Sequence, residues 1–363
     1  MEASPFPYQG PLEPEQVQGR DELVADLVER VSEHRVTALL GPRRYGKTSV
    51  LRRVARDVIH GGASVVWVDL YEAASMADVA VRFDAALARV PGAFATTAAK
   101  VAAGLSLNLG LIGVELRAPE RDRPDPALVL QALLDTLIRA ARDTPTVVVM
   151  DEFSSVAKVP GAAGALRTGL QHHFQQIGLV FAGSEPSTMR MLFTDQAQPF
   201  YAQADIVPIG PLARVEVVAT VVDGFAATGR SAGPVAGHIA HLARGHPQRT
   251  MQLADACWRL VPPGGAADEG TWADGLAAVR DATSEGNERL FSGFHDGEKL
   301  VLRVLASGGS LFGSAGRLLG LATGTAQHAR QALVDKGQVV AVDGRYEVVD
   351  PILADWVARR LPV

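Results

Sequence analysis

The chain has 363 residues, of which 47% are hydrophobic and 21% are charged, an ordinary globular composition that excludes a largely disordered protein. This length predicts two or three domains, and the formal net charge of −5 argues against a basic coat that grips nucleic acid non-specifically. The single cysteine, Cys257, excludes an intrachain disulfide and a cysteine-based zinc site, which fits a reducing compartment.

The N-terminal residues 1–8 contain no basic segment followed by an apolar run, so no signal peptide is predicted. No stretch of about 18 uninterrupted apolar residues is present that would predict a membrane span. We therefore expect a soluble, cytoplasmic protein without membrane contact.

The N-terminal part of the chain is predicted to form an arm, a helix, a strand, a turn and a second helix. The segment up to about Pro14 is rich in proline, which favours an extended arm. An amphipathic helix that starts near Leu23 follows. Residues 36–40 form an apolar run that ends at Gly41 and predicts a buried strand, and an apolar stripe after Lys47 predicts another helix.

The turn between this strand and this helix, residues 41–48, matches the pattern G-x-x-x-x-G-K-[ST] of a phosphate-binding loop. Gly41 and Gly46 let the backbone curl, so that its N–H groups and the helix N-terminus point at phosphates. Lys47 can reach the β- and γ-phosphates and the Thr48 hydroxyl can join a Mg²⁺ shell, so we expect ATP and Mg²⁺ as cofactors. The predicted nucleotide-binding residues of the loop are Gly41, Pro42, Arg43, Arg44, Tyr45, Gly46, Lys47, Thr48 and Ser49.

Four further apolar runs predict buried strands, at residues 64–68, 146–150, 179–182 and 206–209. Helical patterns separate these runs, for example at residues 127–142 and 165–176. Strands that alternate with helices predict an α/β fold in which a parallel sheet is covered on both faces.

Residues 105–111 alternate leucine with small or polar residues, which is the period of a strand. Because this segment lies between the second and third predicted strands, we expect it to be part of an inserted hairpin. A flap that covers core surface is the favoured interpretation, and a flap that binds a partner is the alternative.

An acidic pair, Asp151 and Glu152, follows the apolar run at residues 146–150. Asp151 is predicted to hold Mg²⁺ through its water shell, and Glu152 to orient the attacking water or accept its proton. Adjacent carboxylates at a strand end can also be a solvated surface, but the phosphate-binding loop favours catalysis.

From about residue 212 to residue 291 the pattern is helical, with breaks at glycine and proline turns. A third unit follows, in which Asp343-Gly344 is a strong hairpin signal between two strands. Three helices followed by a hairpin is a winged-helix order. Its predicted helices and strands are residues 298–306, 313–319, 325–336, 338–342, 346–349 and 351–360.

These motifs resemble the archaeal-type P-loop ATPase group, which lies near the STAND and Orc/Cdc6-like branches of the AAA+ ATPases. Residues 41–49 are similar to that group's G-x-R-R-x-G-K-T-S form, which is narrower than a generic phosphate-binding loop. Gly19 and Arg20 match a box that lies near the adenine in the group. Residues 346–356 resemble the group's winged-helix ending.

The resemblance also implies roles for two polar residues after the acidic pair. Residues 165–171 and 179–184 are similar to the group's next helix and strand, which puts Ser184 at the sensor-1 position beside the γ-phosphate or the water. Residues 245–249 resemble the turn before a lid helix, which makes Arg249 the candidate sensor-2 arginine. An ordinary surface arginine is the alternative for Arg249.

The sequence departs from the group's pattern at Gln203, and the resemblance gives His246 no catalytic role. Where the group usually has an arginine, this chain has Gln203. Without that arginine as a finger on the transition state, we expect slow turnover or an arginine from elsewhere, for which Arg190 is a weak candidate. His246 is expected to be structural.

The predicted recognition helix of the winged-helix unit carries Gln327, His328, Arg330 and Lys336, which could meet phosphates or base edges. From residue 296 to the C-terminus, however, seven acidic and eight Lys or Arg residues nearly cancel. A DNA reader usually shows a clearer basic bias, so contact within the chain or with another protein is favoured over DNA.

Together these features predict a P-loop NTPase with an AAA+-like α/β core, a helical lid and a C-terminal winged-helix domain. The expected domains are residues 1–211 with the arm, 212–294 for the lid and 295–363 for the winged helix. The expected function is an ATP-binding protein and slow Mg-dependent ATPase that acts as a conformational switch. The alternative is a DNA-binding regulator gated by ATP, and the expected partners include an unknown protein and an ATP-dependent oligomer.

Overall fold

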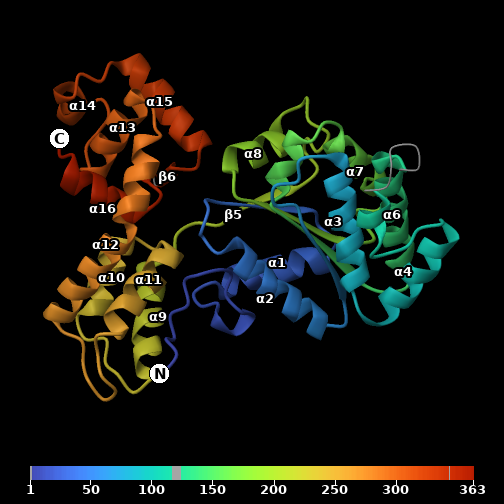
Figure 1. The fold of residues 1–363 in the computed structure, drawn as a ribbon, viewed down its shortest axis with the longest axis horizontal. Helices are drawn as coiled ribbons and strands as arrows, with labels where there is room; N and C mark the ends of the chain where they lie inside the picture. Colours follow the sequence, from blue (N-terminus) through green and yellow to red (C-terminus); the bar gives the residue numbers. More distant parts are fainter. Residues whose placement is uncertain (1, 117–123, 343) are drawn as a thin grey trace.

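The protein is described by a computed structural model that covers residues 2–116, 124–342 and 344–363. Figure 1 shows three parts: a sheet covered by helices, a helical bundle beside it, and a C-terminal unit next to the bundle. The N-terminal arm lies against the bundle and leads from there into the sheet part. No helix in these ranges combines the length and the apolar character needed to cross a lipid bilayer.

A five-stranded parallel sheet forms the centre of the first part, which confirms the predicted α/β fold. Its strands are β1 (Thr37–Leu40), β2 (Ser64–Asp69), β3 (Thr146–Asp151), β4 (Gly178–Gly183) and β5 (Asp205–Pro208). They lie in the order β2-β3-β4-β1-β5. Every residue of β1, β3 and β4 is buried, because helices cover both faces of a parallel sheet.

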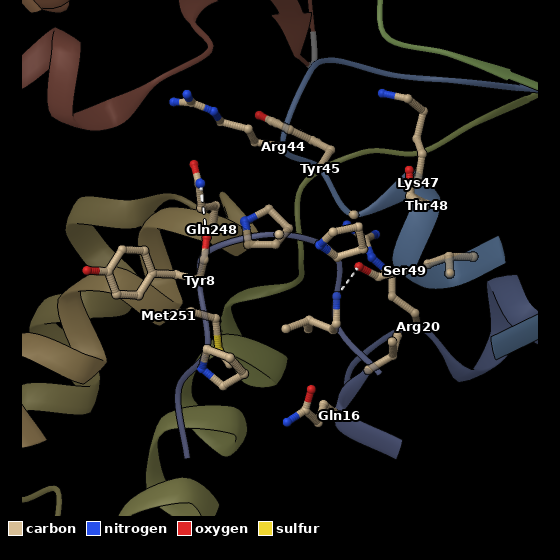
Figure 2. Close-up of a pocket in the computed structure, with 18 of the residues that line it drawn as sticks. Tyr8, Gln16, Arg20, Arg44, Tyr45, Lys47, Thr48, Ser49, Gln248 and Met251 are labelled. Atoms are coloured by element: carbon tan, nitrogen blue, oxygen red, sulfur yellow. Dashed lines mark hydrogen bonds between the residues drawn. The ribbon is translucent and has the colours of Figure 1, made fainter. Parts of the chain in front are cut away.

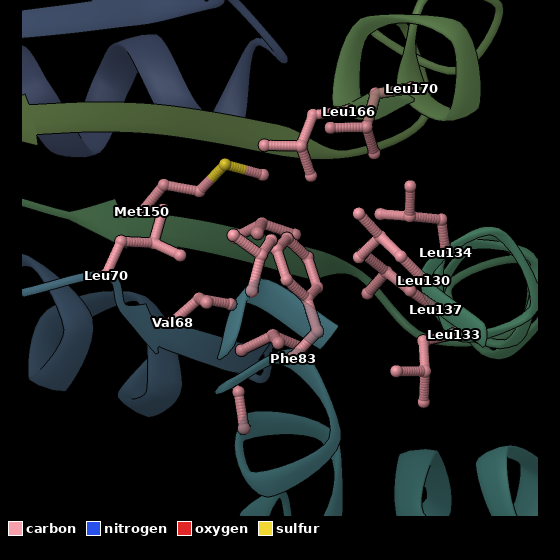
Figure 3. Packing of buried hydrophobic residues seen from close by; sticks show 14 of the residues in the cluster. Val68, Leu70, Phe83, Leu130, Leu133, Leu134, Leu137, Met150, Leu166 and Leu170 are labelled. Carbon is pink, nitrogen blue, oxygen red and sulfur yellow. The ribbon is translucent and has the colours of Figure 1, made fainter. Parts of the chain in front are cut away.

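Helices pack on the two faces of this sheet and bury two separate apolar clusters. On one face lie α1 (Asp21–Ser32) and α2 (Lys47–His60), with η1 (Pro14–Gln16) beside them. Phe83 lies fully buried in the opposite cluster, among apolar side chains that include Val68, Met150 and Leu133 (Figure 3). The elements that build this opposite face are α3 (Met76–Arg89), α4 (Gly92–Gly104), α5 (Ile112–Glu115), α6 (Pro126–Ala140), η3 (Phe153–Lys158), α7 (Ala162–Leu170) and α8 (Pro186–Thr194).

The predicted hairpin at residues 105–111 was wrong, because these residues form turns between α4 and α5. The buried Asp84 carboxylate of α3 accepts hydrogen bonds from the backbone N–H groups of Gly110 and Ile112, at 2.7 and 3.2 Å. Leu107 and Leu109 pack against the core cluster. Turns around a buried carboxylate therefore bring alternate leucines inward without a strand, and the segment covers core surface.

The helical bundle contains α9 (Arg214–Ala226), α10 (Val235–Ala243), α11 (Pro247–Trp258) and α12 (Glu269–Ser292). The arm adds Phe6 to the bundle core, where its ring centroid lies 5.6 Å from that of Phe225. Further along the arm, the Leu12 N–H donates to Ser49 Oγ of α2 at 2.9 Å. The arm thus bridges the bundle and the first helix after the phosphate-binding loop.

The C-terminal unit has the predicted order of three helices, a hairpin and a last helix. Its elements are α13 (Asp296–Ala306), α14 (Ser314–Leu318), α15 (Thr323–Asp335), β6 (Val339–Val342), β7 (Arg345–Val348) and α16 (Pro351–Arg360). Strands β6 and β7 pair in antiparallel fashion. Asp343 of the predicted turn lies outside the described residues, and the winged-helix assignment and the three domain boundaries stay predictions.

Candidate phosphate-binding and catalytic site

The predicted phosphate-binding loop connects the end of β1 to the start of α2, as the motif requires. Gly46 precedes α2 with φ +87°, a conformation that favours glycine. Gly41 has no room for a side chain, since a Cβ there would lie 2.3 Å from Ile209 Cγ2. The two glycines therefore permit the close curl that turns backbone N–H groups and the α2 N-terminus toward an anion.

Lys47 is folded back over its own loop. Its buried Nζ donates to the carbonyl oxygens of Gly41 and Pro42, each at 2.8 Å. Burial lowers the pKa of Lys47 to about 8, against the raising influence of the Glu152 and Asp151 carboxylates. A phosphate would give this ammonium group stronger partners than two carbonyl oxygens, because charge-assisted hydrogen bonds are the stronger kind.

Thr48 and Asp151 meet across the space between α2 and the end of β3. The Thr48 hydroxyl donates to Asp151 Oδ2 at 2.9 Å. Burial raises the pKa of Asp151 to about 6, which the hydrogen bond from Thr48 opposes. A hydroxyl and a carboxylate beside a phosphate-binding loop are the oxygen ligands that Mg²⁺ prefers when it is shared with phosphates, so this pair fits the ion.

Glu152 and Ser184 come from the ends of the neighbouring strands β3 and β4. Glu152 has φ +52°, which turns its side chain away from the strand direction. Its Oε2 accepts hydrogen bonds from the Ser184 hydroxyl at 2.7 Å and the Ser184 N–H at 3.1 Å. The predicted base and the predicted sensor are therefore in direct contact.

A cavity of about 460 Å³ lies beside the loop, between the sheet part, the arm and the bundle (Figure 2). Two of its lining residues in α11 have side-chain oxygens that are buried without a hydrogen-bond partner in the described chain, Gln248 Oε1 and Thr250 Oγ1. The sequence marked this wall only through the turn at residues 245–249, where it singled out Arg249 and did not predict Gln248 or Thr250 as lining residues. Side chains from outside the loop that line it include Tyr8, Leu12, Arg20, Thr220, Gln248 and Met251.

Gly19 and Arg20 lie at this cavity or next to it. Arg20 lines the cavity and donates to the Gly210 carbonyl at 2.7 Å, and burial lowers its pKa to about 10. Gly19 has φ +66° and is close to Glu216 of α9. Both residues therefore lie where the sheet part meets the bundle.

The Tyr45 side chain of the loop packs against the turn that precedes α11 in the bundle. Its buried ring meets the His246 ring edge-on, with centroids 5.1 Å apart. His246 precedes α11, and its Nδ1 accepts the Arg249 N–H at 3.3 Å, a capping role that agrees with the structural role expected for it. Burial lowers the pKa of His246 to about 4.

Arg249 is not brought to the cavity. Its buried guanidinium binds the carboxylate of Asp350, the residue that caps α16, with Nε 2.9 Å from Oδ1. A sensor-2 role for Arg249 stays a prediction, and it would require this ion pair to open. Gln203 and Arg190 also lie outside the lining of the cavity, and the Gln203 amide donates to the Tyr201 carbonyl.

The predicted recognition helix α15 uses two of its cationic side chains within the chain. The Arg330 guanidinium lies 4.3 Å from the centre of the Tyr346 ring, and Lys336 Nζ lies 2.6 Å from Glu298 Oε1. Helix α15 also packs against α8 of the sheet part. Gln327 and His328 remain exposed.

Several solved structures share this arrangement over nearly their whole length. A Walker-type ATPase of Pyrococcus abyssi is 19% identical and matches with a TM-score of 0.68, over 97% of this chain and 99% of that chain. The ORC2 protein of Aeropyrum pernix, solved with ADPNP and ADP, is 15% identical and matches with a TM-score of 0.54, over 98% of each chain. The ORC1 protein of the same organism, solved with DNA, is 15% identical and gives 0.51, over 95% of this chain and 93% of that chain.

Neither the protein-family models nor the curated proteins contain a match to this chain. At identities below 20%, the likeness to the solved structures establishes the fold. The chain therefore has the fold of these proteins, built on a five-stranded parallel sheet, and the predicted α/β fold is confirmed.

Proposed function

We propose that this chain binds Mg·ATP and hydrolyses it slowly, and that the nucleotide controls a conformational switch. The observation that carries the proposal is the meeting of two polar pairs at one edge of the sheet, beside the phosphate-binding loop. Thr48 contacts Asp151 there, and Glu152 contacts Ser184. A loop with only a structural role would not require a metal-binding pair and a general base in these positions.

The loop and α2 would bind the phosphates through backbone N–H groups and the positive end of the helix dipole. Lys47 would exchange its two carbonyl partners for β- and γ-phosphate oxygens. Thr48 and Asp151 would hold Mg²⁺, whose chemistry in this place is to neutralise charge on the phosphate oxygens.

Hydrolysis needs one proton acceptor near the γ-phosphate. The oxygen of the attacking water would bond to the γ-phosphorus while the bond to the β–γ bridging oxygen breaks, which gives ADP and phosphate. Glu152 would take the proton of that water. Ser184, whose hydroxyl donates a hydrogen bond to Glu152 in this structure, would orient the Glu152 carboxylate.

The contacts of the loop support a switch. Tyr45 lies against His246, and Val349, next to β7, belongs to the apolar cluster that also contains Tyr45. Arg249 and Asp350 then tie α11 to α16. A loop that changes shape around a nucleotide would therefore act on both the bundle and the C-terminal unit.

The variant Glu152→Gln tests this function. We expect ATP affinity within about threefold of wild type, while hydrolysis falls by about 10² to 10⁴-fold because the amide cannot take a proton. The matched control is Glu185→Gln, which alters a nearby carboxylate that is paired with Lys158. Equal turnover in wild type and Glu152→Gln would contradict the assignment of Glu152 as the base. Wild type that does not hydrolyse ATP would contradict the proposed ATPase activity.

A second candidate function is a DNA-binding regulator gated by ATP, which the exposed Gln327 and His328 on α15 favour. The Aeropyrum pernix ORC1 structure of the same fold contains DNA. Against this candidate, Arg330 and Lys336 are engaged within the unit. Titration with duplex DNA at low salt, with and without ATP, separates the two functions, and no binding at low salt removes the second.

A further inference from the structure

Two neighbouring arginines of the phosphate-binding loop, Arg43 and Arg44, are both exposed but lie in different surroundings. Arg43 Nε lies 3.4 Å from Ser184 Oγ, at the hydroxyl that is bound to Glu152. Arg44 has φ +67° and extends to the opposite side of the loop from Lys47 (Figure 2). One guanidinium therefore faces the predicted catalytic pair and the other faces the bundle.

The charges around each arginine agree with these directions. The Lys158 ammonium lowers the pKa of Glu185, and Arg43 contributes in the same direction. Burial lowers the pKa of His246, to which Arg44 contributes. Arg43 is thus electrostatically close to the γ-phosphate end of the site, and Arg44 to α11.

Arg43 also lies where two cavities meet. It lines the cavity beside the loop and a second cavity of about 330 Å³, which Glu152 and Ser184 line as well. Within the described ranges, no carboxylate lies at ion-pair distance from its guanidinium. A planar cation with free N–H donors, at the junction where a γ-phosphate would sit, is suited to bind phosphate oxygens.

Phosphoryl transfer spreads negative charge over the γ-phosphate oxygens, and an arginine that binds them in the transition state accelerates the reaction. Gln203, where the resemblance given above implies an arginine, lies outside the lining of the cavity. We propose that Arg43, within the phosphate-binding loop, is the catalytic arginine of this chain. This inference rests on the proposed ATPase function and adds the residue that stabilises its transition state.

In this step the γ-phosphorus bonds to the water oxygen, the β–γ bridging bond breaks, and its electron pair stays on ADP. Glu152 takes the proton, and Arg43 remains protonated throughout. Its guanidinium moves from the Ser184 hydroxyl to the equatorial γ-oxygens. Because these contacts strengthen as charge develops, Arg43 should affect kcat more than ATP affinity.

The experiment compares Arg43→Ala with the control Arg52→Ala, which removes a partly exposed arginine of α2 outside the site, in full-length protein. We expect Arg43→Ala to lose about 10² to 10³-fold in kcat while ATP affinity changes less than about fivefold, and Arg52→Ala to stay within about threefold in both. ADP with aluminium fluoride and Mg²⁺, which imitates the transition state, should bind wild type and Arg52→Ala but bind Arg43→Ala at least about 50-fold more weakly. Arg43→Lys should regain part of the rate, since it keeps the charge but not the planar fork.

Several outcomes would overturn the inference. Unchanged kcat in Arg43→Ala would remove Arg43 from catalysis, and a loss of ATP affinity as large as the loss of kcat would make it an ordinary binding residue. A loss of kcat in Arg52→Ala as large as that in Arg43→Ala would attribute the effect to lost positive charge in general and remove the specific role of Arg43. If wild type binds ATP without hydrolysing it, the proposed ATPase activity itself is contradicted. This result is distinguishable from a failure of the Arg43 proposal, because it is measured on wild type alone.

Discussion

The edge of the sheet and the junction between α11 and α16 are both rich in charged and polar side chains, but they use them differently. At the edge, Thr48 contacts Asp151, and Glu152 contacts Ser184. A cavity lies beside these two pairs. At the junction, the Arg249 and Asp350 side chains are only 8% and 17% exposed and bind each other through three pairs of atoms.

This difference follows from how the two regions are built. Parallel strands end together, so residues that follow β3 and β4 come together at one edge, where the fold leaves space in front of them. Charges on packed helices of two units are buried when the units meet, and burial requires a partner. An arginine close to a nucleotide site therefore indicates a ligand contact only when no carboxylate has already bound it.

The largest expected effect belongs to Lys47→Ala, which removes the one buried ammonium group at the edge. We expect ATP affinity to fall by about 10² to 10³-fold, because a buried charge partner of the phosphates is lost. Isothermal titration with Mg·ATP measures this. Arg52→Ala, an exposed position on the same helix, is the control, and equal affinity in Lys47→Ala and wild type would contradict a phosphate-binding role.

The next effect concerns the junction. Arg249→Ala should destabilise the protein by about 3 kcal/mol, because Asp350 stays buried without its cation. Arg244→Ala, which breaks a more exposed pair with Glu347 at 3.6 Å, should change stability by less than about 0.5 kcal/mol. Urea unfolding measures both. Equal, small effects would mean that the buried pair does not hold the two units together.

The smallest effect is a pH dependence of the same junction. His246 has a pKa of about 4 in the folded chain against an ordinary value of 6.5, so the unfolded chain binds its proton first as pH falls. The stability present above pH 6.5 is therefore lost progressively toward pH 4, by about 2 kcal/mol between pH 7 and pH 5.

The variant His246→Asn keeps a capping side chain before α11 but cannot titrate. Its unfolding free energy should fall about 2 kcal/mol less than that of wild type over this pH range. Parallel curves for the two proteins would show that His246 takes up its proton as easily when folded as when unfolded.

Most of the polar edge of the sheet could be predicted from the sequence because its residues follow short apolar runs. A run, a glycine turn and a helix indicate the place of Lys47, and the end of another run indicates that of Glu152, whereas Ser184 was expected only from the family resemblance. Their contact with each other then follows from strand order.

The rest depends on contacts between distant segments, which leave no local pattern. Arg249 and Asp350 meet only because the C-terminal unit folds back on α11. The arm and α11 line the cavity through Tyr8, which no motif marks, and through Gln248, which lies in the marked turn but was not predicted to face the site. At residues 105–111 the alternation of leucines with polar residues wrongly predicted a strand. Turns around the Asp84 carboxylate bring alternate leucines to the core, as a strand would.

The N-terminal arm limits how far the two walls of the cavity beside the loop can separate. Phe6 is anchored in the core of the bundle, and Leu12 is hydrogen-bonded to Ser49 at the start of α2. Six residues of fully extended chain reach about 20 Å, so the arm is a tether of limited length. While Phe6 and Leu12 keep these contacts, any opening between the bundle and the loop is limited to this distance.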